Sequence, residues 1–249
     1  MINKIYESFD GAVADIPDGA TIMVGGFAGP GGFPYCLVKA LGKQGAKDLT
    51  IISNNAGGIG LTLEFDDLKI LFENKQVKKV IASFPFSTSA SRPSPAEKQI
   101  LAKEVELEYA SQGTLVERIR DGGAGIPAFY TPTGVGTVLE KGKKKKRFGG
   151  FLFWGGKVYL LEKALKVDYA LIRAFKADAL GNLVYRGTAR NFNPVMITAG
   201  GITIAEVDLI VERGDIQPDH IHTPGNYVKR IVKVKEGPGF PRNIVRRFF

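Results

Sequence analysis

Five glycines lie within eight residues, from Gly25 to Gly32, directly after the short apolar run 22–24. Glycine adopts backbone angles that other residues avoid, so main-chain N–H groups in such a loop can point toward a bound group. A helix-like pattern follows from Pro34, and the start of a helix adds further N–H donors. The loop therefore predicts a site for a negatively charged oxygen, although a tight turn without a ligand would need the same glycines.

The two common phosphate-binding loops do not fit this segment. A Walker A loop ends in Lys followed by Ser or Thr, whereas Phe33-Pro34 stands here. A dinucleotide fingerprint that began at Gly29 would need Gly or Ala at position 34. The G-x-G-x-x-A match at 123–128 contains Pro127 and follows no apolar strand. A site for nucleotide phosphates is therefore not indicated.

Polar residues also follow two later apolar segments. Segment 49–52 leads into Ser53, Asn54 and Asn55, and the alternating segment 105–109 leads toward Gln112 and Gly113. In open parallel sheets, ligands bind at the carboxyl ends of the strands. The sequence thus predicts that both segments and the glycine loop meet at one edge of a sheet. The alternative for Asn54 is a turn residue whose side chain bonds only its own backbone.

The sequence predicts that alternating strands and helices hold these residues in place. Short apolar or β-branched runs predict strands at 21–24, 49–53, 77–83 and 105–109, and helical patterns lie at 34–45, 64–74 and 95–103. A further helix is expected after Gly113, through Asp121. This alternation predicts an α/β fold, an open and mainly parallel sheet with helices on both faces. At 249 residues the chain is expected to form a single domain, 1–249.

Charge is strongly biased, with 34 Lys and Arg against 25 Asp and Glu and a net charge of +9. Such a balance suits a polyanionic ligand or an acidic partner, or ordinary solvation of the surface. The most basic run, 141–147, is expected at the tip of a hairpin in a small β-rich insertion around 136–160, with its lysines in water. Phosphate or nucleic-acid contact is the alternative, weakened by the lack of base-stacking aromatics.

Other chemistry has little support in the sequence. The single cysteine, Cys36, lies in an apolar run and predicts a buried structural thiol. No Cys or third His lies near His220 and His222, so no metal is expected. The sequence has no run of about 20 apolar residues and starts with neither a signal nor a transit peptide, which predicts a cytoplasmic protein without membrane contact.

Seven groups of motifs, in order along about 5–234, carry a family resemblance. They are Asp18-Gly19 leading to Gly25-Gly26-Phe27, then Ser53-Asn54-Asn55-Ala56-Gly57, Gln112-Gly113-Thr114-Leu115, Glu117-Arg118-Ile119-Arg120, the segment 122–131, the segment 176–178 with Gly181-Asn182, and Ala189-Arg190-Asn191-Phe192-Asn193. With them the sequence resembles the A (alpha) subunit of family I coenzyme A transferases, the group that includes succinyl-CoA:3-oxoacid and 3-oxoadipate CoA-transferases. Its glycine loop differs by one extra residue, since four residues, 28–31, precede Gly32-Phe33-Pro34.

The resemblance implies a fold of the CoA-transferase (NagB-RpiA-like) type and roles for particular residues. Asn54 matches an oxyanion-hole asparagine, Asn55 supports its turn, and Gln112 matches a residue that contacts the far end of the acyl group. Substrate-binding positions are further implied at Gly25, Gly26, Phe27, Gly31, Gly32 and Gly113. A coenzyme A thioester would be the substrate, with no separate cofactor and no metal.

The family's nucleophile, a glutamate in a Glu-Asn-Gly context, is missing here. None of the thirteen glutamates is followed by Asn-Gly, and the nearest match, Glu73-Asn74, continues with Lys75. The resemblance therefore implies a partner B (beta) subunit that carries this glutamate, in an A2B2 assembly, and no nucleic acid or membrane partner. Two other classes stay open on the sequence: a non-catalytic ligand-sensing or sugar-phosphate-binding domain, and a basic RNA-associated protein.

Overall fold

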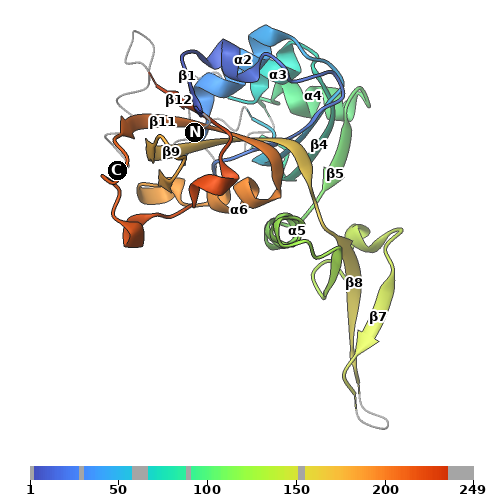
Figure 1. Ribbon diagram of the computed structural model, residues 1–249. Coiled ribbons are helices and arrows are strands. Elements are labelled where there is room, and N and C mark those ends of the chain that lie inside the picture. The colour runs from blue at the N-terminus through green and yellow to red at the C-terminus, as the bar shows by residue number, and fades with distance from the viewer. Residues whose placement is uncertain (1–2, 28–30, 58–66, 88–90, 151–154, 235–249) are drawn as a thin grey trace.

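The computed structural model describes residues 3–27, 31–57, 67–87, 91–150 and 155–234 (Figure 1). Most strands within these residues form one sheet, in the order β1-β12-β11-β9-β2-β3-β4-β5, and every pair along this path is parallel. The short β10 adds an antiparallel pair with β9. The strands are β1 (Ile5–Tyr6), β2 (Thr21–Val24), β3 (Leu49–Asn55), β4 (Val77–Phe84), β5 (Glu106–Tyr109), β9 (Val167–Asp178), β10 (Leu183–Val184), β11 (Gly200–Val211) and β12 (Arg230–Lys233).

Helices cover both faces of this sheet, which confirms the predicted α/β class. One face is covered by α1 (Phe9–Val13), α2 (Tyr35–Gln44), α3 (Lys69–Glu73) and α4 (Pro95–Leu101), the other by α5 (Gln112–Ala124) and α6 (Phe192–Ala199) (Figure 1). Successive residues of a strand face opposite ways, so Ile51 packs in the first core and Ile52 in the second. Short 3-10 turns lie at η1 (Val138–Glu140), η2 (Gly187–Ala189), η3 (Pro218–His220) and η4 (Gly225–Tyr227).

A small antiparallel sheet projects from the body of the molecule (Figure 1). Its strand order is β6 (Ala128–Thr131), β8 (Lys157–Lys163), β7 (Lys145–Phe148). The predicted β-rich insertion is thus present, with wider bounds than 136–160. The placement of the basic run 141–147 at a hairpin tip was wrong in part: its last three residues lie in β7, where Lys145 pairs with Leu160 and Arg147 with Val158. Their side chains are exposed, as expected.

Several element boundaries also differ from the sequence-based expectation, two of them at predicted site residues. Strand β3 runs through Asn55 rather than ending at 53, so both asparagines belong to the strand. Helix α5 starts at Gln112 and continues to Ala124, past the expected end at Asp121. Gly122 and Gly123 therefore lie inside the helix. A Cβ on Gly122 would lie 1.8 Å from the carbonyl oxygen of Leu165, so these glycines allow close packing rather than ending the helix. The expected helix 64–74 was too long: residues 64–66 lie outside the described part, residues 67 and 68 are not helical, and α3 spans only Lys69–Glu73.

Candidate functional site

The sheet register brings the predicted site segments to one edge. Met23 pairs with Ile52, Ser53 with Ala82, and Ala82 with Tyr109. One to three residues further along the chain from these pairs, Gly25, Asn54, Ser83 and the start of α5 therefore follow one another across the carboxyl edge of the sheet. Neighbouring strands are about 4.8 Å apart, so groups at adjacent strand ends lie within reach of a single small ligand, while the whole row from β2 to β5 spans roughly 14 Å.

Asn54 is held by side chains from two other elements. It is 5% exposed, and its Oδ1 accepts hydrogen bonds from Nε2 of Gln112 at 2.8 Å and from Oγ of Ser83 at 3.0 Å. Neither partner belongs to its own turn. With Oδ1 occupied in this way, Nδ2 makes no hydrogen bond to the described part of the chain and is left as a donor at the strand edge.

Asn55 directly follows Asn54 in the sequence but has different hydrogen-bond partners. Its Oδ1 accepts a hydrogen bond from the main-chain N–H of Gly57 at 2.9 Å, and its carbonyl oxygen accepts one from the Ser53 hydroxyl. The turn-forming role considered for Asn54 thus describes Asn55. Because alternate residues of a strand face opposite sides, the two amides point away from each other.

The glycine loop is fixed by two asparagines of the segment 189–193. Nδ2 of Asn191 donates to the carbonyl oxygen of Gly31 at 2.7 Å, and Nδ2 of the fully buried Asn193 donates to that of Gly32 at 3.0 Å. A Cβ on Gly25 would lie 1.9 Å from Oδ1 of Asn193. Gly25 must therefore be glycine for packing, whether or not the loop binds an anion. Residues 28–30 of this loop lie outside the described part.

The remaining predicted positions lie beside this loop and at the start of α5. Gly26 has a φ of +100°, and a Cβ there would lie 2.9 Å from Cα of Phe33. Phe27 is 46% exposed and stacks on Phe192, with ring centroids 6.4 Å apart. A Cβ on Gly113 would meet nothing within 4 Å. Packing inside the chain thus accounts for Gly26 but not for Gly113.

Glu206 was not singled out from the sequence, yet it anchors the helix that follows the glycine loop. Its buried carboxylate accepts the main-chain N–H groups of Cys36 at 2.9 Å and Leu37 at 3.1 Å, and it pairs with Arg173. Burial, together with this carboxylate, raises the pKa of the Cys36 thiol to about 12. Cys36 therefore stays protonated near neutral pH, as a structural thiol does, but it is half-buried rather than buried as predicted.

Metal chemistry and membrane insertion receive no support from the described residues. His222 uses Nδ1 to accept the main-chain N–H of Tyr185 at 2.9 Å, and its ring stacks on Tyr185. No group of three or more His, Cys, Asp or Glu side chains in the described ranges is placed to hold a metal ion. Within the same ranges, each helix is too short or too polar to cross a bilayer.

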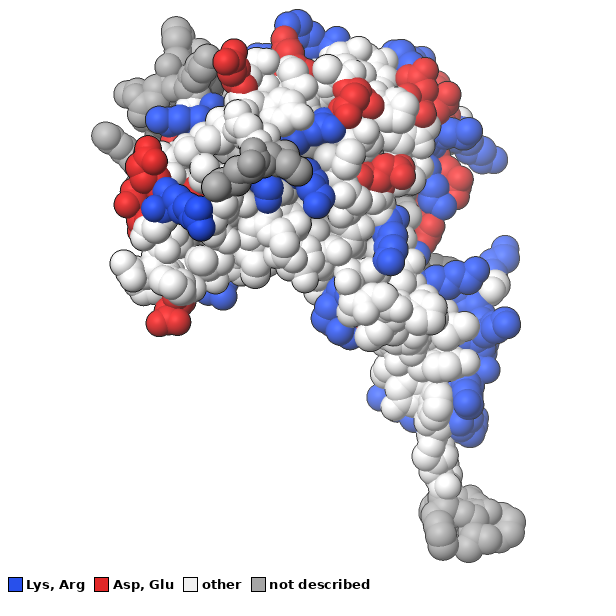
Figure 2. All heavy atoms as spheres, viewed as in Figure 1, with Lys and Arg blue, Asp and Glu red and all other residues white. Residues whose placement is uncertain are grey.

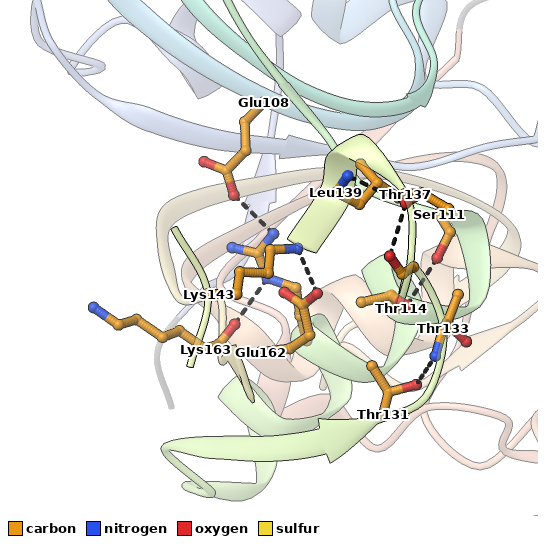
Figure 3. Close-up of polar contacts among 12 residues, drawn as sticks. Glu108, Ser111, Thr114, Thr131, Thr133, Thr137, Leu139, Lys143, Glu162 and Lys163 are labelled. Atoms are coloured by element: carbon orange, nitrogen blue, oxygen red, sulfur yellow. Dashed lines mark hydrogen bonds and ion pairs between the residues drawn. The ribbon is translucent and has the colours of Figure 1, made fainter. Parts of the chain in front are cut away.

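The projecting sheet is tied to the body at its base (Figure 3). Arg118 of α5 donates from Nε to the carbonyl oxygen of Lys163 at 2.8 Å and pairs with Glu108 at 2.8 Å, while Lys143 pairs with the buried Glu162 at 2.5 Å. Away from this base, Lys and Arg side chains line the sheet (Figure 2). Most of them are far more exposed than Asn54 and Asn55 at the strand edge.

Comparison with known proteins defines the class to which this fold and strand edge belong. The family model described as coenzyme A transferase matches residues 6–234. The chain belongs to this family, as the motifs predicted.

Individual relatives narrow the class further. The chain is 48% identical over 233 residues to the A subunit of a probable succinyl-CoA:3-ketoacid coenzyme A transferase of Bacillus subtilis, covering 93% of this chain and 90% of the relative. It is 47% identical over 234 residues to the A subunit of the Helicobacter pylori succinyl-CoA:3-ketoacid coenzyme A transferase, with 93% of each chain covered. Its fold matches an acyl-CoA transferase of Escherichia coli O157:H7 with a TM-score of 0.79 and 22% identity, covering 96% of this chain and 52% of that one. The non-catalytic alternative is not favoured by these similarities.

Proposed function

We propose that this chain is the A subunit of a 3-oxoacid CoA-transferase that moves CoA from succinyl-CoA to a 3-oxoacid such as acetoacetate. Family membership and the relatives named as A subunits support this function. The observation that carries it is the Asn54 amide, held through Oδ1 by two donors with Nδ2 left at the strand edge.

The reaction proceeds by way of a carboxylate nucleophile on a partner subunit. The carboxylate attacks the thioester carbon, the CoA thiolate leaves, and an acyl anhydride forms. The thiolate then attacks the enzyme's own acyl carbon, which releases succinate and leaves an enzyme–CoA thioester. The 3-oxoacid carboxylate reverses these two steps and departs as its CoA thioester. CoA is thus a substrate, and no further cofactor takes part.

Each of these attacks passes through a tetrahedral oxyanion, which Asn54 would stabilise. A neutral amide donor keeps its proton at every working pH, and the loss of one such donor typically lowers kcat by about 10²–10³. Helix α5 also favours a negative charge here, because the positive end of its dipole lies at the same strand edge and its first turn contains no acidic side chain. The glycine loop, with Gly25, Gly26, Phe27, Gly31 and Gly32, would contact the substrate from the neighbouring strand end.

The nucleophile would come from a B subunit with a Glu-Asn-Gly segment, in an A2B2 assembly. Support comes from the absence of this segment among the glutamates of the sequence and from the relatives named as A subunits. The experiment is reconstitution. The purified chain alone should show no thioester exchange, and addition of a B chain should restore it. Appreciable exchange by the pure chain at matched concentration would contradict the proposal.

A second acceptor class has comparable support, because the chain is also 47% identical over 236 residues to the A subunit of a Pseudomonas putida 3-oxoadipate CoA-transferase. Both enzymes would share the same chemistry and differ only in the acid that receives CoA. Values of kcat/KM for acetoacetate and 3-oxoadipate, measured with the reconstituted complex and succinyl-CoA, decide between them. We expect acetoacetate to be preferred, and a preference for 3-oxoadipate would reassign the substrate but not the reaction.

A further inference from the structure

Ser83 is the last residue but one of β4, the strand that pairs with the strand of Asn54, and was not among the residues predicted from the sequence. It is 8% exposed, and its Oγ lies 3.0 Å from Oδ1 of Asn54 and 3.2 Å from the main-chain oxygen of the same residue. The register explains this contact, because Ser53 pairs with Ala82 and Asn55 with Phe84. Ser83 therefore stands directly beside Asn54.

Gln112 reaches the same oxygen from a different element. It is the first residue of α5, and its Nε2 lies 2.8 Å from Oδ1 of Asn54. The resemblance to the family implied a different role, contact with the far end of the acyl group. In this structure one N–H of its amide is committed to Asn54 instead.

From these contacts we infer that Ser83 and Gln112 are positioning residues that fix which way the Asn54 amide faces, so that Nδ2 rather than Oδ1 meets the oxyanion. The inference deepens the proposed function and rests on it. An amide can turn over about its last bond, and the wrong orientation would present an oxygen to a developing negative charge. Two donors on Oδ1, from separate elements, oppose that turn.

A reversed hydrogen-bond pattern at position 112 tests this orientation. Gln112→Glu replaces the donor with an acceptor-only carboxylate, which attracts Nδ2 of Asn54 and turns Oδ1 toward the substrate. The expected result in the A–B complex is a kcat lower by about 10²-fold, close to that of Asn54→Ala. Gln112→Lys keeps a donor and should retain most of kcat. Because Gln112 is an exposed residue, both variants at this position are expected to fold.

Ser83 is tested by a smaller change with a matched control. Ser83→Ala should lower kcat by about tenfold at little cost in KM, and Ser83→Thr, which keeps the hydroxyl, should restore it. Ser111→Ala removes a hydroxyl of the same size that bonds Thr114 at 2.8 Å instead of Asn54 (Figure 3), and should leave kcat near the wild-type value.

A double-mutant cycle separates positioning from every other role. In an Asn54→Ala background, Gln112→Glu and Ser83→Ala should have almost no further effect on kcat, and the effect of Gln112→Ala should be equal for acetoacetate and 3-oxoadipate. Additive losses in that background, or a loss confined to one acceptor, would overturn the inference while leaving the proposed function intact. An inactive wild-type complex would overturn both.

Discussion

The strand edge that holds Asn54 and the projecting sheet of β6, β7 and β8 are built on opposite principles. At the edge, the amide of Asn54 is buried and is held by Ser83 and Gln112, which belong to two other elements. On the projecting sheet, charged side chains stand in water and pair locally, as Lys145 does with Glu140 at 2.7 Å. The protein's most conspicuous charges are therefore not where its proposed chemistry lies.

This difference follows from what each surrounding does to a polar group. A buried donor without a partner costs about 1–3 kcal/mol, so every hydrogen bond at the edge restricts geometry and each loss should be measurable. An exposed ion pair is screened by water and salt and adds little to stability. Substitutions should therefore have graded effects from the glycine loop at the strand edge, through the base of the projecting sheet, to its surface.

Gly32→Ala should have the largest effect on folding. Gly32 has a φ of +72°, and a Cβ there would lie 2.7 Å from Cα of Ala189, so strain and collision combine. We expect a loss of about 3 kcal/mol in the free energy of unfolding, measured with urea. Gly19→Ala is the control: its φ is +76° but the space is open, so only about 1 kcal/mol should be lost. Equal losses would show that packing at the loop is not tight.

Arg118→Ala should have an intermediate effect, because it removes the bonds that join α5, β5 and the projecting sheet. Arg118 is 8% exposed and contacts Glu108 and the carbonyl oxygen of Lys163. We expect a loss of about 2 kcal/mol in unfolding free energy, with faster amide hydrogen exchange in β8 than in β3. Faster exchange in β3 as well would mean that the two regions are not separable.

Lys145→Ala should have the smallest effect. Its side chain is about half exposed and pairs with a carboxylate on the same surface, so the melting temperature should equal that of the wild type in 0.15 M salt. A clear drop in melting temperature would show that the charges of the projecting sheet support the fold, and the contrast between the two regions would fail.

The main sheet could be predicted from sequence because each of its central strands is a short apolar run, as in 21–24 and 49–53. The projecting sheet was harder to place. Lys145 and Arg147 lie in a strand because they pair with Leu160 and Val158 of β8. The basic run by itself does not indicate that such a partner strand exists.

The candidate edge shows the same limit at the level of single residues. Asn54 and Asn55 are identical neighbours in the sequence, and only the register and α5 give them different partners. Ser83 was missed because a lone serine at the end of a strand carries no signal of its own. Its position becomes informative only once β4 is known to lie beside β3.

The most direct test of the account is kcat of the A–B complex carrying Asn54→Ala, measured with succinyl-CoA and acetoacetate beside the matched variant Asn55→Ala. We predict that Asn54→Ala lowers kcat by about 10²–10³, as the loss of an oxyanion donor requires, and lowers the melting temperature only by what the lost bonds from Ser83 and Gln112 explain. Asn55→Ala should lower the melting temperature and change kcat much less, since its amide holds the Gly57 turn. Wild-type kcat in the Asn54→Ala complex, or a change in KM alone, would contradict the central claim.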